Sequence, residues 1–302
     1  MKRFLLFVTG FIIIGLAGSR AQEKITIALW GDSRENLDNA CENIAGILLR
    51  DTTAWDVQVH TGDFTHHGAE EDWDRTLAFK GVKELYVKGR FLMCTSNHDA
   101  EEDNSSYPNK RATWDKFTGA VLPHNDADGS THFFAWHKDN VHLVFCDAFF
   151  TDSTTMQRWL DKYLEQVKPE DWLIGVWHDP AFALTYKEAY LSTCKPWMES
   201  MVRHGGDFIF NGHAHQYIRT KPLAPNGVVD EAHGMVTLVN GTGGASWKEA
   251  APKGPMIAFT PVEKSFPCIT FLTLSGHTAT VKTVDARPDK GLAVIDTWTW
   301  ER

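Results

Sequence analysis

The sequence contains few cysteines, and they form no recognisable pattern. Its 302 residues include five cysteines, an odd number at wide spacing, without any Cys-x-x-Cys pair. A thiolate zinc site is therefore not indicated. Cys94 and Cys146 lie within apolar, strand-like runs, where we expect buried free thiols. One disulfide could form in an oxidising compartment, but the sequence does not identify which two cysteines would pair.

Positive charge is also scarce. The chain has 30 Lys and Arg against 39 Asp and Glu, a net charge of −9, and it has no basic stripe. A nucleic-acid backbone is therefore not expected as its main partner. A small anionic substrate remains compatible with this balance, because bound metal ions can supply local positive charge.

Long hydrophobic runs are missing except near the start of the chain. Lys2 and Arg3 precede an apolar run over residues 4–16, and Ser19 and Ala21 occupy the −3 and −1 places of a cleavage site. This pattern predicts a secretory signal peptide over residues 1–21, and a secreted or periplasmic domain over residues 22–302 without a membrane span. The run is short for a bilayer span, so an uncleaved anchor is the less favoured alternative.

The remaining chain has no internal repeat, and its pattern is that of a layered α/β protein. We expect strands at 24–30, 55–60, 90–95, 172–177 and 207–210, and helices at 35–50, 70–80, 153–167 and 195–204. A hairpin is expected over residues 131–146, and a polar loop facing the substrate over 101–130. Strands at 235–239, 268–274, 278–284 and 292–300 suggest a second sheet packed on the first.

Metal-ligand side chains follow five of these strands. They are Asp32, Asp63, Asn97-His98-Asp99, His178, and His213 with His215. Sites in open α/β sheets form at the carboxyl ends of strands, so we expect these side chains to converge. Aspartates are common in turns, but five such coincidences in order favour a metal site. Two cations about 3.5–4 Å apart would make hydroxide available near neutral pH and polarise phosphoryl oxygens.

The ordered motifs Gly31-Asp32, Gly62-Asp63, Asn97-His98-Asp99, His178 and Gly212-His213-x-His215 resemble the calcineurin-like metallophosphoesterase superfamily, which includes the purple acid phosphatases. The resemblance implies a four-layer α/β/β/α sandwich in which Asp63 bridges two metals. It implies that Asn97, His178 and His213 hold one metal, and that Asp32 and His215 hold the other. It also implies that His98 is the leaving-group acid, oriented by Asp99. Residues 241–244, Gly-Thr-Gly-Gly, resemble a family loop near the site.

One motif departs from the family. The usual first motif of the family is Asp-x-His, whereas this chain has Asp32-Ser33-Arg34. Purple acid phosphatases also lack that histidine and use a tyrosine three residues after the bridging aspartate, a place that His66 takes here. We infer that His66 replaces the missing ligand, with an exposed loop histidine as the alternative. Arg34 is expected to contact substrate phosphate, with a pair to a neighbouring acid as the alternative.

The sequence therefore predicts a dinuclear metal-dependent phosphoesterase, either a phosphatase or a phosphodiesterase, with a small phosphate ester as substrate. Two divalent or trivalent ions, Mn, Zn or Fe, are the expected cofactors. The alternative is a non-catalytic phosphate- or metal-binding protein that retains the fold. The pair His98-Asp99 favours the enzyme, because simple metal binding needs no acid outside the ligand set.

Overall fold

The computed structural model describes residues 24–100, 109–184, 191–249, 254–261 and 264–302. The predicted signal peptide lies outside these ranges. Within them, no helix combines the length and the apolar character that a membrane crossing requires.

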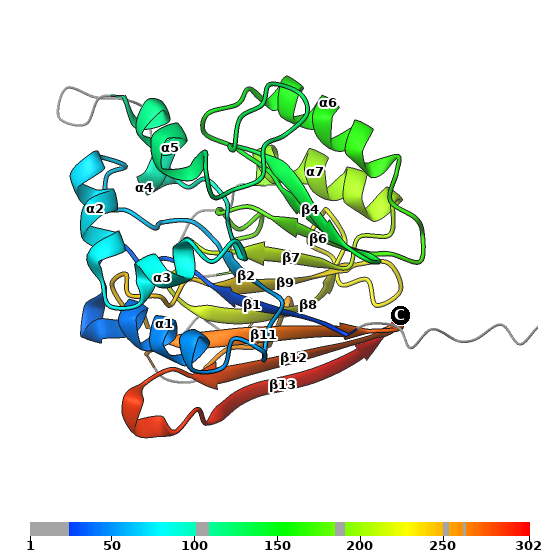
Figure 1. Cartoon of the computed structure of the whole chain (residues 1–302). Helices are drawn as coiled ribbons and strands as arrows, with labels where there is room; N and C mark the ends of the chain where they lie inside the picture. Colours follow the sequence, from blue (N-terminus) through cyan, green and yellow to red (C-terminus); the bar gives the residue numbers. More distant parts are fainter. Residues whose placement is uncertain (1–23, 101–108, 185–190, 250–253, 262–263) are drawn as a thin grey trace, which may run out of the picture.

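Two sheets form the centre of the molecule (Figure 1). Sheet A has the strand order β13-β12-β11-β1-β2-β3. Its strands are β1 (Ile25–Trp30), β2 (Val57–His60), β3 (Phe91–Met93), β11 (Cys268–Ser275), β12 (Thr278–Asp285) and β13 (Val294–Glu301). Sheet B has the order β10-β8-β9-β7-β6-β5-β4. Its strands are β4 (Phe134–Lys138), β5 (Val141–Phe145), β6 (Trp172–Val176), β7 (Phe208–Asn211), β8 (Tyr217–Leu223), β9 (Met235–Asn240) and β10 (Ile257–Phe259).

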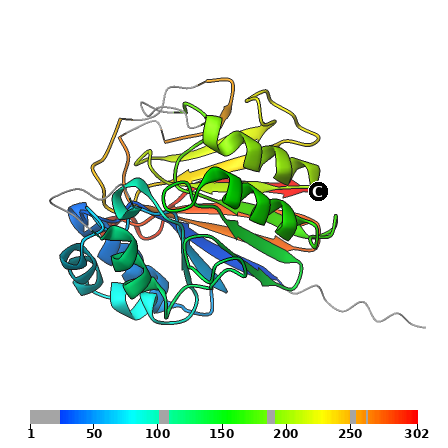
Figure 2. The same cartoon turned by 90° about the horizontal axis from the view of Figure 1, so that it is seen from above.

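Helices cover the outer faces of the two sheets, as Figures 1 and 2 show from two directions. On the side of sheet A these are α1 (Ala40–Arg50), α2 (Glu70–Ala78) and α3 (Val82–Tyr86). On the side of sheet B they are α6 (Ser153–Leu164) and α7 (Leu191–Arg203). The short α4 (Asn97–Ala100) and α5 (Lys110–Thr118) complete the α-helices of the described residues. The four-layer α/β/β/α sandwich is confirmed.

The apolar pattern explains this layering. Ile44 and Leu48 of α1 are spaced four residues apart, and both are buried in the core cluster that includes sheet A. All six residues of β1 are buried, as expected for a strand covered on both faces. The hairpin of β4 and β5 is also confirmed, with His137 opposite His142 in an antiparallel pair.

Three predictions about the elements were wrong in detail. The helix expected from residue 35 begins at Ala40, because Asn36, Asp38 and Asn39 have φ angles of 49°, 53° and 56°, which a right-handed helix does not allow. The expected loop over 101–130 contains α5, which buries Trp114; residues 101–108 lie outside the described residues. Two packed sheets are present, as expected, but the late strands divide between them: β9 belongs to sheet B, whereas β11 pairs with β1 and extends sheet A together with β12 and β13.

The cysteines carry no disulfide. Cys41, Cys94, Cys146, Cys194 and Cys268 are all buried and free. The expectation of buried free thiols at positions 94 and 146 is confirmed.

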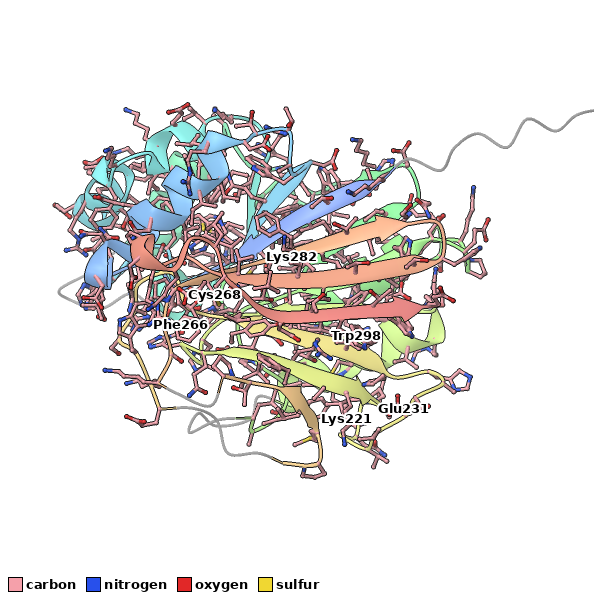
Figure 3. All side chains as sticks on the ribbon, turned by 90° about the horizontal axis from the view of Figure 1, so that it is seen from below. Lys221, Glu231, Phe266, Cys268, Lys282 and Trp298 are labelled. Carbon is pink, nitrogen blue, oxygen red and sulfur yellow. The ribbon has the colours of Figure 1, made fainter. Side chains whose placement is uncertain are left out.

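A buried ion pair joins the two sheets. Asp296 of β13 accepts hydrogen bonds from Nε and Nη2 of Arg219 in β8, at 2.8 and 3.0 Å, and from the hydroxyl of Tyr217 at 2.8 Å. The guanidinium also lies 5.1 Å from the ring of Trp298, whose place on β13 Figure 3 shows. The pair therefore ties the last strand of sheet A to sheet B.

We expect Asp296→Ala to lower the free energy of unfolding by about 3–5 kcal/mol, because it leaves the Arg219 charge buried without its carboxylate. Urea unfolding followed by circular dichroism would measure this. The matched control is Asp289→Ala, which removes an exposed aspartate 3.0 Å from Lys290 and should leave the midpoint unchanged. Equal midpoints for both variants would contradict a structural role for the ion pair.

Candidate metal centre

The two sheets bring their parallel strands to one edge. In sheet A, β1, β2 and β3 are parallel, and in sheet B, β6, β7 and β9 are parallel. The predicted ligands follow the carboxyl ends of these strands, after residues 30, 60, 93, 176 and 211. The convergence expected from the sequence therefore occurs at this edge.

Four predicted ligands have an uncommon backbone conformation. The φ angles of Asp32, Asp63, His213 and His215 are 56°, 54°, 63° and 48°. Such left-handed conformations are unfavourable for residues with a side chain, and they concentrate at functional sites. Here they turn the chain sharply at the ends of β1, β2 and β7, so that each side chain points into the same space.

The first ligand group consists of Asp32, Asp63 and His215, whose ligand atoms all lie within 4.8 Å of one another. Nε2 of His215 is 3.4 Å from Oδ1 of Asp32. The backbone N–H of His213 donates to both oxygens of Asp32 at 3.0 Å. A Cβ added at Gly241 would come within 2.7 Å of Oδ2 of Asp32, so the Gly-Thr-Gly-Gly loop passes directly beside this carboxylate.

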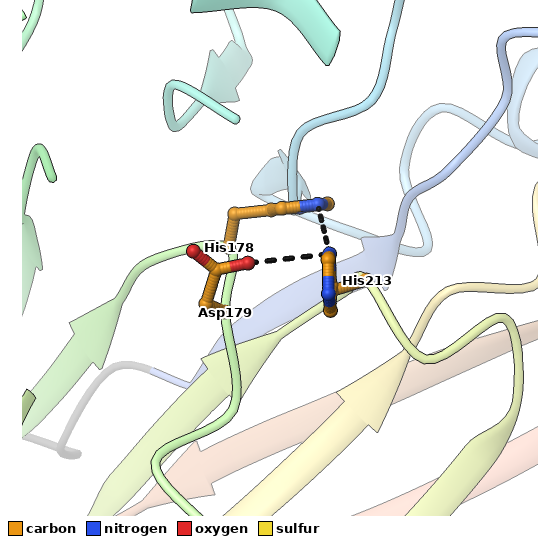
Figure 4. A group of neighbouring side chains, drawn as sticks. All are labelled: His178, Asp179 and His213. Atoms are coloured by element: carbon orange, nitrogen blue, oxygen red, sulfur yellow. Dashed lines mark hydrogen bonds and ion pairs between the residues drawn. The ribbon is translucent and has the colours of Figure 1, made fainter. Parts of the chain in front are cut away.

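The second ligand group consists of His178, Asp179 and His213 (Figure 4). Nδ1 of His213 lies 3.3 Å from Nε2 of His178 and 3.2 Å from Oδ1 of Asp179. Oδ1 of Asn97 lies 3.1 Å from that nitrogen of His178 and 3.2 Å from that of His213. Asp179 was missed in the sequence, although it follows His178 directly and could have been found by its position.

Asp63 connects the two groups. It belongs to the first, and its Oδ1 lies 3.2 Å from Nε2 of His178 in the second. The ring of His178 is held by its other nitrogen, since Nδ1 donates to the carbonyl of Thr61 at 2.6 Å. This bond leaves the lone pair of Nε2 directed at Asp63 and Asn97. Such an outer bond is the usual way in which a ligating imidazole is oriented.

His98 stands beside both groups and belongs to neither. Its Nε2 lies 4.0 Å from Oδ2 of Asp63, and its Nδ1 donates to the carbonyl of His66 at 2.6 Å. The sequence led us to expect that Asp99 orients His98. Instead, the carboxylate of Asp99 accepts bonds from the backbone N–H groups of Phe64 and Thr65 and from the Thr65 and Ser96 hydroxyls. Asp99 thus fixes the loop that carries Asp63, and the His66 carbonyl holds the His98 ring.

Arg34 and His66, the two residues at which the sequence departs from the family, have different surroundings. Nη1 of Arg34 donates to Oδ2 of Asp63 at 2.5 Å and to Nε2 of His215 at 3.2 Å. The ring of His66 packs against His67 and His98, with centroids 4.2 and 5.6 Å away, and it belongs to neither ligand group. A contact of Arg34 with phosphate and a ligand role for His66 both stay predictions.

Burial and neighbouring charge shift the pKa values of these groups. Burial raises the pKa of Asp32 to about 7, and the charge of Asp63 acts in the same direction. Burial would also raise the pKa of Asp63, but His178, His98 and Arg34 together lower it below its usual range. Burial and the charge of Asp63 raise the pKa of Asp99. Burial lowers that of His178, but the charges of Asp63 and Asp32 outweigh it and raise the pKa.

The donor set fits metal ions. In the second group, oxygen and imidazole lone pairs approach one another at 3.1–3.3 Å, an arrangement that requires a cation or a proton between them. Carboxylate, amide and imidazole ligands suit Zn, Mn and Fe. Asn97, His178 and His213, joined by Asp179, would hold one ion. Asp32 and His215 would hold another, with Asp63 between them.

Comparison with known proteins agrees with this geometry. A family model described as calcineurin-like phosphoesterase matches residues 25–217. This chain belongs to that family. The match begins at β1 and extends past His215, so it includes every predicted site residue of this calcineurin-like phosphoesterase.

Its relatives include plant enzymes. The chain is 28% identical over 196 residues to purple acid phosphatase 15 of Arabidopsis thaliana, covering 61% of this chain and 35% of the relative. It is 24% identical over 249 residues to a nucleotide pyrophosphatase/phosphodiesterase of Hordeum vulgare, covering 70% and 64%. The structure of a purple acid phosphatase from yellow lupin seeds has a TM-score of 0.71 at 16% identity, covering 93% and 54%. This calcineurin-like phosphoesterase thus spans less than two thirds of each relative's length, and the structural likeness supports the fold.

We expect Asp99→Ala to weaken metal binding by about 10–100-fold, because it removes the group that holds the Asp63 loop. Calorimetric titration with Mn²⁺ would measure the affinity. Asp171→Ala is the matched control, since it removes a buried aspartate at the opposite end of β6, 3.3 Å from His142. An unchanged Mn²⁺ affinity in Asp99→Ala would show that the loop does not depend on this carboxylate.

Proposed function

We propose that this calcineurin-like phosphoesterase hydrolyses small phosphate esters at a dinuclear metal centre. The observation that carries the proposal is the presence of two ligand groups that share Asp63, with His98 beside them and outside both. When bound, the metal ions would supply a hydroxide nucleophile near neutral pH and polarise the phosphoryl oxygens. Membership of the family supports phosphoester hydrolysis. We propose in addition that the site binds two ions, Mn, Zn or Fe.

The chain's own residues then have distinct tasks. His98 would donate a proton from Nε2 to the leaving oxygen, while the His66 carbonyl accepts from Nδ1 and so stabilises the charged ring. Arg34, a planar fork of donors, would bind a phosphate oxygen. Asp99 would keep Asp63 in place. His66 as a ligand of the first group would require its ring to turn away from His98.

The proposed substrates include phosphomonoesters and phosphodiesters. The relatives include proteins named as phosphatases and one named as a phosphodiesterase, and the site residues are compatible with either. Export rests on residues 1–21 alone and stays a prediction from the sequence.

We expect Asp63→Ala to bind metal in neither ligand group and to lose all turnover, because this carboxylate lies beside both groups. Plasma emission would give the metal content, and p-nitrophenyl phosphate and its bis ester with Mn, Zn or Fe would give turnover. The matched control is Asp56→Ala, which removes a carboxylate on the loop before β2 that is bonded to Lys138. A wild-type protein that binds metal and turns over no ester would favour the non-catalytic alternative.

We expect His98→Ala to retain metal and to lose about 10²–10⁴-fold in rate on an alkyl phosphate, because a poor leaving group depends on protonation. The loss should be much smaller on p-nitrophenyl phosphate, whose leaving group is stable as an anion. The kcat for both esters would be compared at the same metal loading. An equal loss on both esters would remove His98 from the role of acid.

A further inference from the structure

Arg34 occupies ligand positions of the first group. Its Nη1 donates to Oδ2 of Asp63 and to Nε2 of His215, at 2.5 and 3.2 Å. These two atoms belong to the side chains that would hold a cation in that group. The guanidinium therefore uses the lone pairs that a metal ion would need.

Hydrogen bonds hold the backbone of Arg34 beside the first group. The N–H groups of Ser33 and Arg34 both donate to the carbonyl of Asp63, at 3.0 and 3.2 Å, and Ala245 donates to the carbonyl of Asp32 at 2.7 Å. The Arg34 residue is only 7% exposed. Its charge is thus built into the loop that carries Asp32.

The chemistry of the guanidinium makes it a competitor and excludes it as a ligand. It stays protonated in proteins and has no acceptor atom. A cation between Asp63 and His215 would have to displace Nη1 and would be repelled by its charge. The second group is bordered by oxygen atoms instead, since Asn97 and the Thr61 carbonyl contact its His178 ring.

We propose that Arg34 is a built-in competitor for the cation of the first ligand group, so that the two groups fill in sequence, the second group before the first. The inference rests on the metal-binding part of the proposed function. A displaced guanidinium becomes available for a phosphate oxygen, which links loading of the first group to binding of substrate. The replacement of the family histidine by arginine thus makes the two halves of the centre unequal.

The test is a calorimetric titration of chelator-treated protein with Mn²⁺ alone. Arg34→Gln removes the charge and keeps a polar side chain. In this variant the second Mn²⁺ equivalent, which enters the first ligand group, should bind at least about tenfold more tightly than in the wild type. The affinity for the first equivalent, which enters the second ligand group, should be unchanged. Arg34→Lys keeps the charge and should retain the weak second equivalent. After gel filtration the wild type should hold about one Mn²⁺ and Arg34→Gln about two.

The matched control is Arg203→Ala, which removes an exposed arginine on α7 that lies 3.9 Å from Asp161 and should titrate like the wild type. If Arg34→Gln does not fold, Arg34→His, which restores the family motif, should show the same gain. No gain in either variant, or an equal gain in Arg34→Lys, would overturn the proposal. The titration does not depend on turnover, so a failure to hydrolyse any ester would overturn the proposed function and leave this result standing.

Discussion

Two buried carboxylates of like charge impose the constraint that the rest of the site must satisfy. Asp32 and Asp63 are 0% and 1% exposed and belong to one ligand group. Buried like charges are unfavourable unless positive charge or hydrogen-bond donors surround them. Their neighbours supply both, since Arg34 and the His213 N–H bond directly to these carboxylates. Burial is the main cause that raises the pKa of Asp32, whereas the charges of His178, His98 and Arg34 outweigh burial at Asp63 and lower its pKa.

The fold meets this demand by placing strand ends from two sheets face to face. Asp32 and Asp63 come from sheet A, whereas His178, His213 and His215 come from sheet B. The second ligand group lies on sheet B alone, whereas the first combines Asp32 and Asp63 of sheet A with His215 of sheet B. Four ligand positions adopt left-handed conformations, which persist at functional sites where the surrounding structure holds the chain in place. The stability of the sandwich thus maintains the geometry of the site.

A family site can also change its character through one side chain. In this chain, Asp32 retains its place, and the residue two positions later is a permanent cation in place of a ligand. The ring that could compensate, His66, packs against His98 instead. The second group, by contrast, has an additional carboxylate in Asp179. The two ligand groups therefore differ in charge, although Asp63 lies beside both.

The sequence by itself determined the layered α/β class, most strands and the convergence of the predicted ligands. These depend on local properties, namely apolar runs of strand length and polar residues directly after them, which the chain displays in order. Only the tertiary structure decided which groups touch. That Asp99 bonds the Phe64–Thr65 backbone and that Arg34 reaches both Asp63 and His215 are contacts across 29 to 181 positions. No spacing rule encodes them, because they depend on how two separate sheets pack and on the left-handed backbone conformations at the strand ends. The start of α1 and the joining of β11 to β1 were decided in the same way, by turn conformation and by long-range pairing.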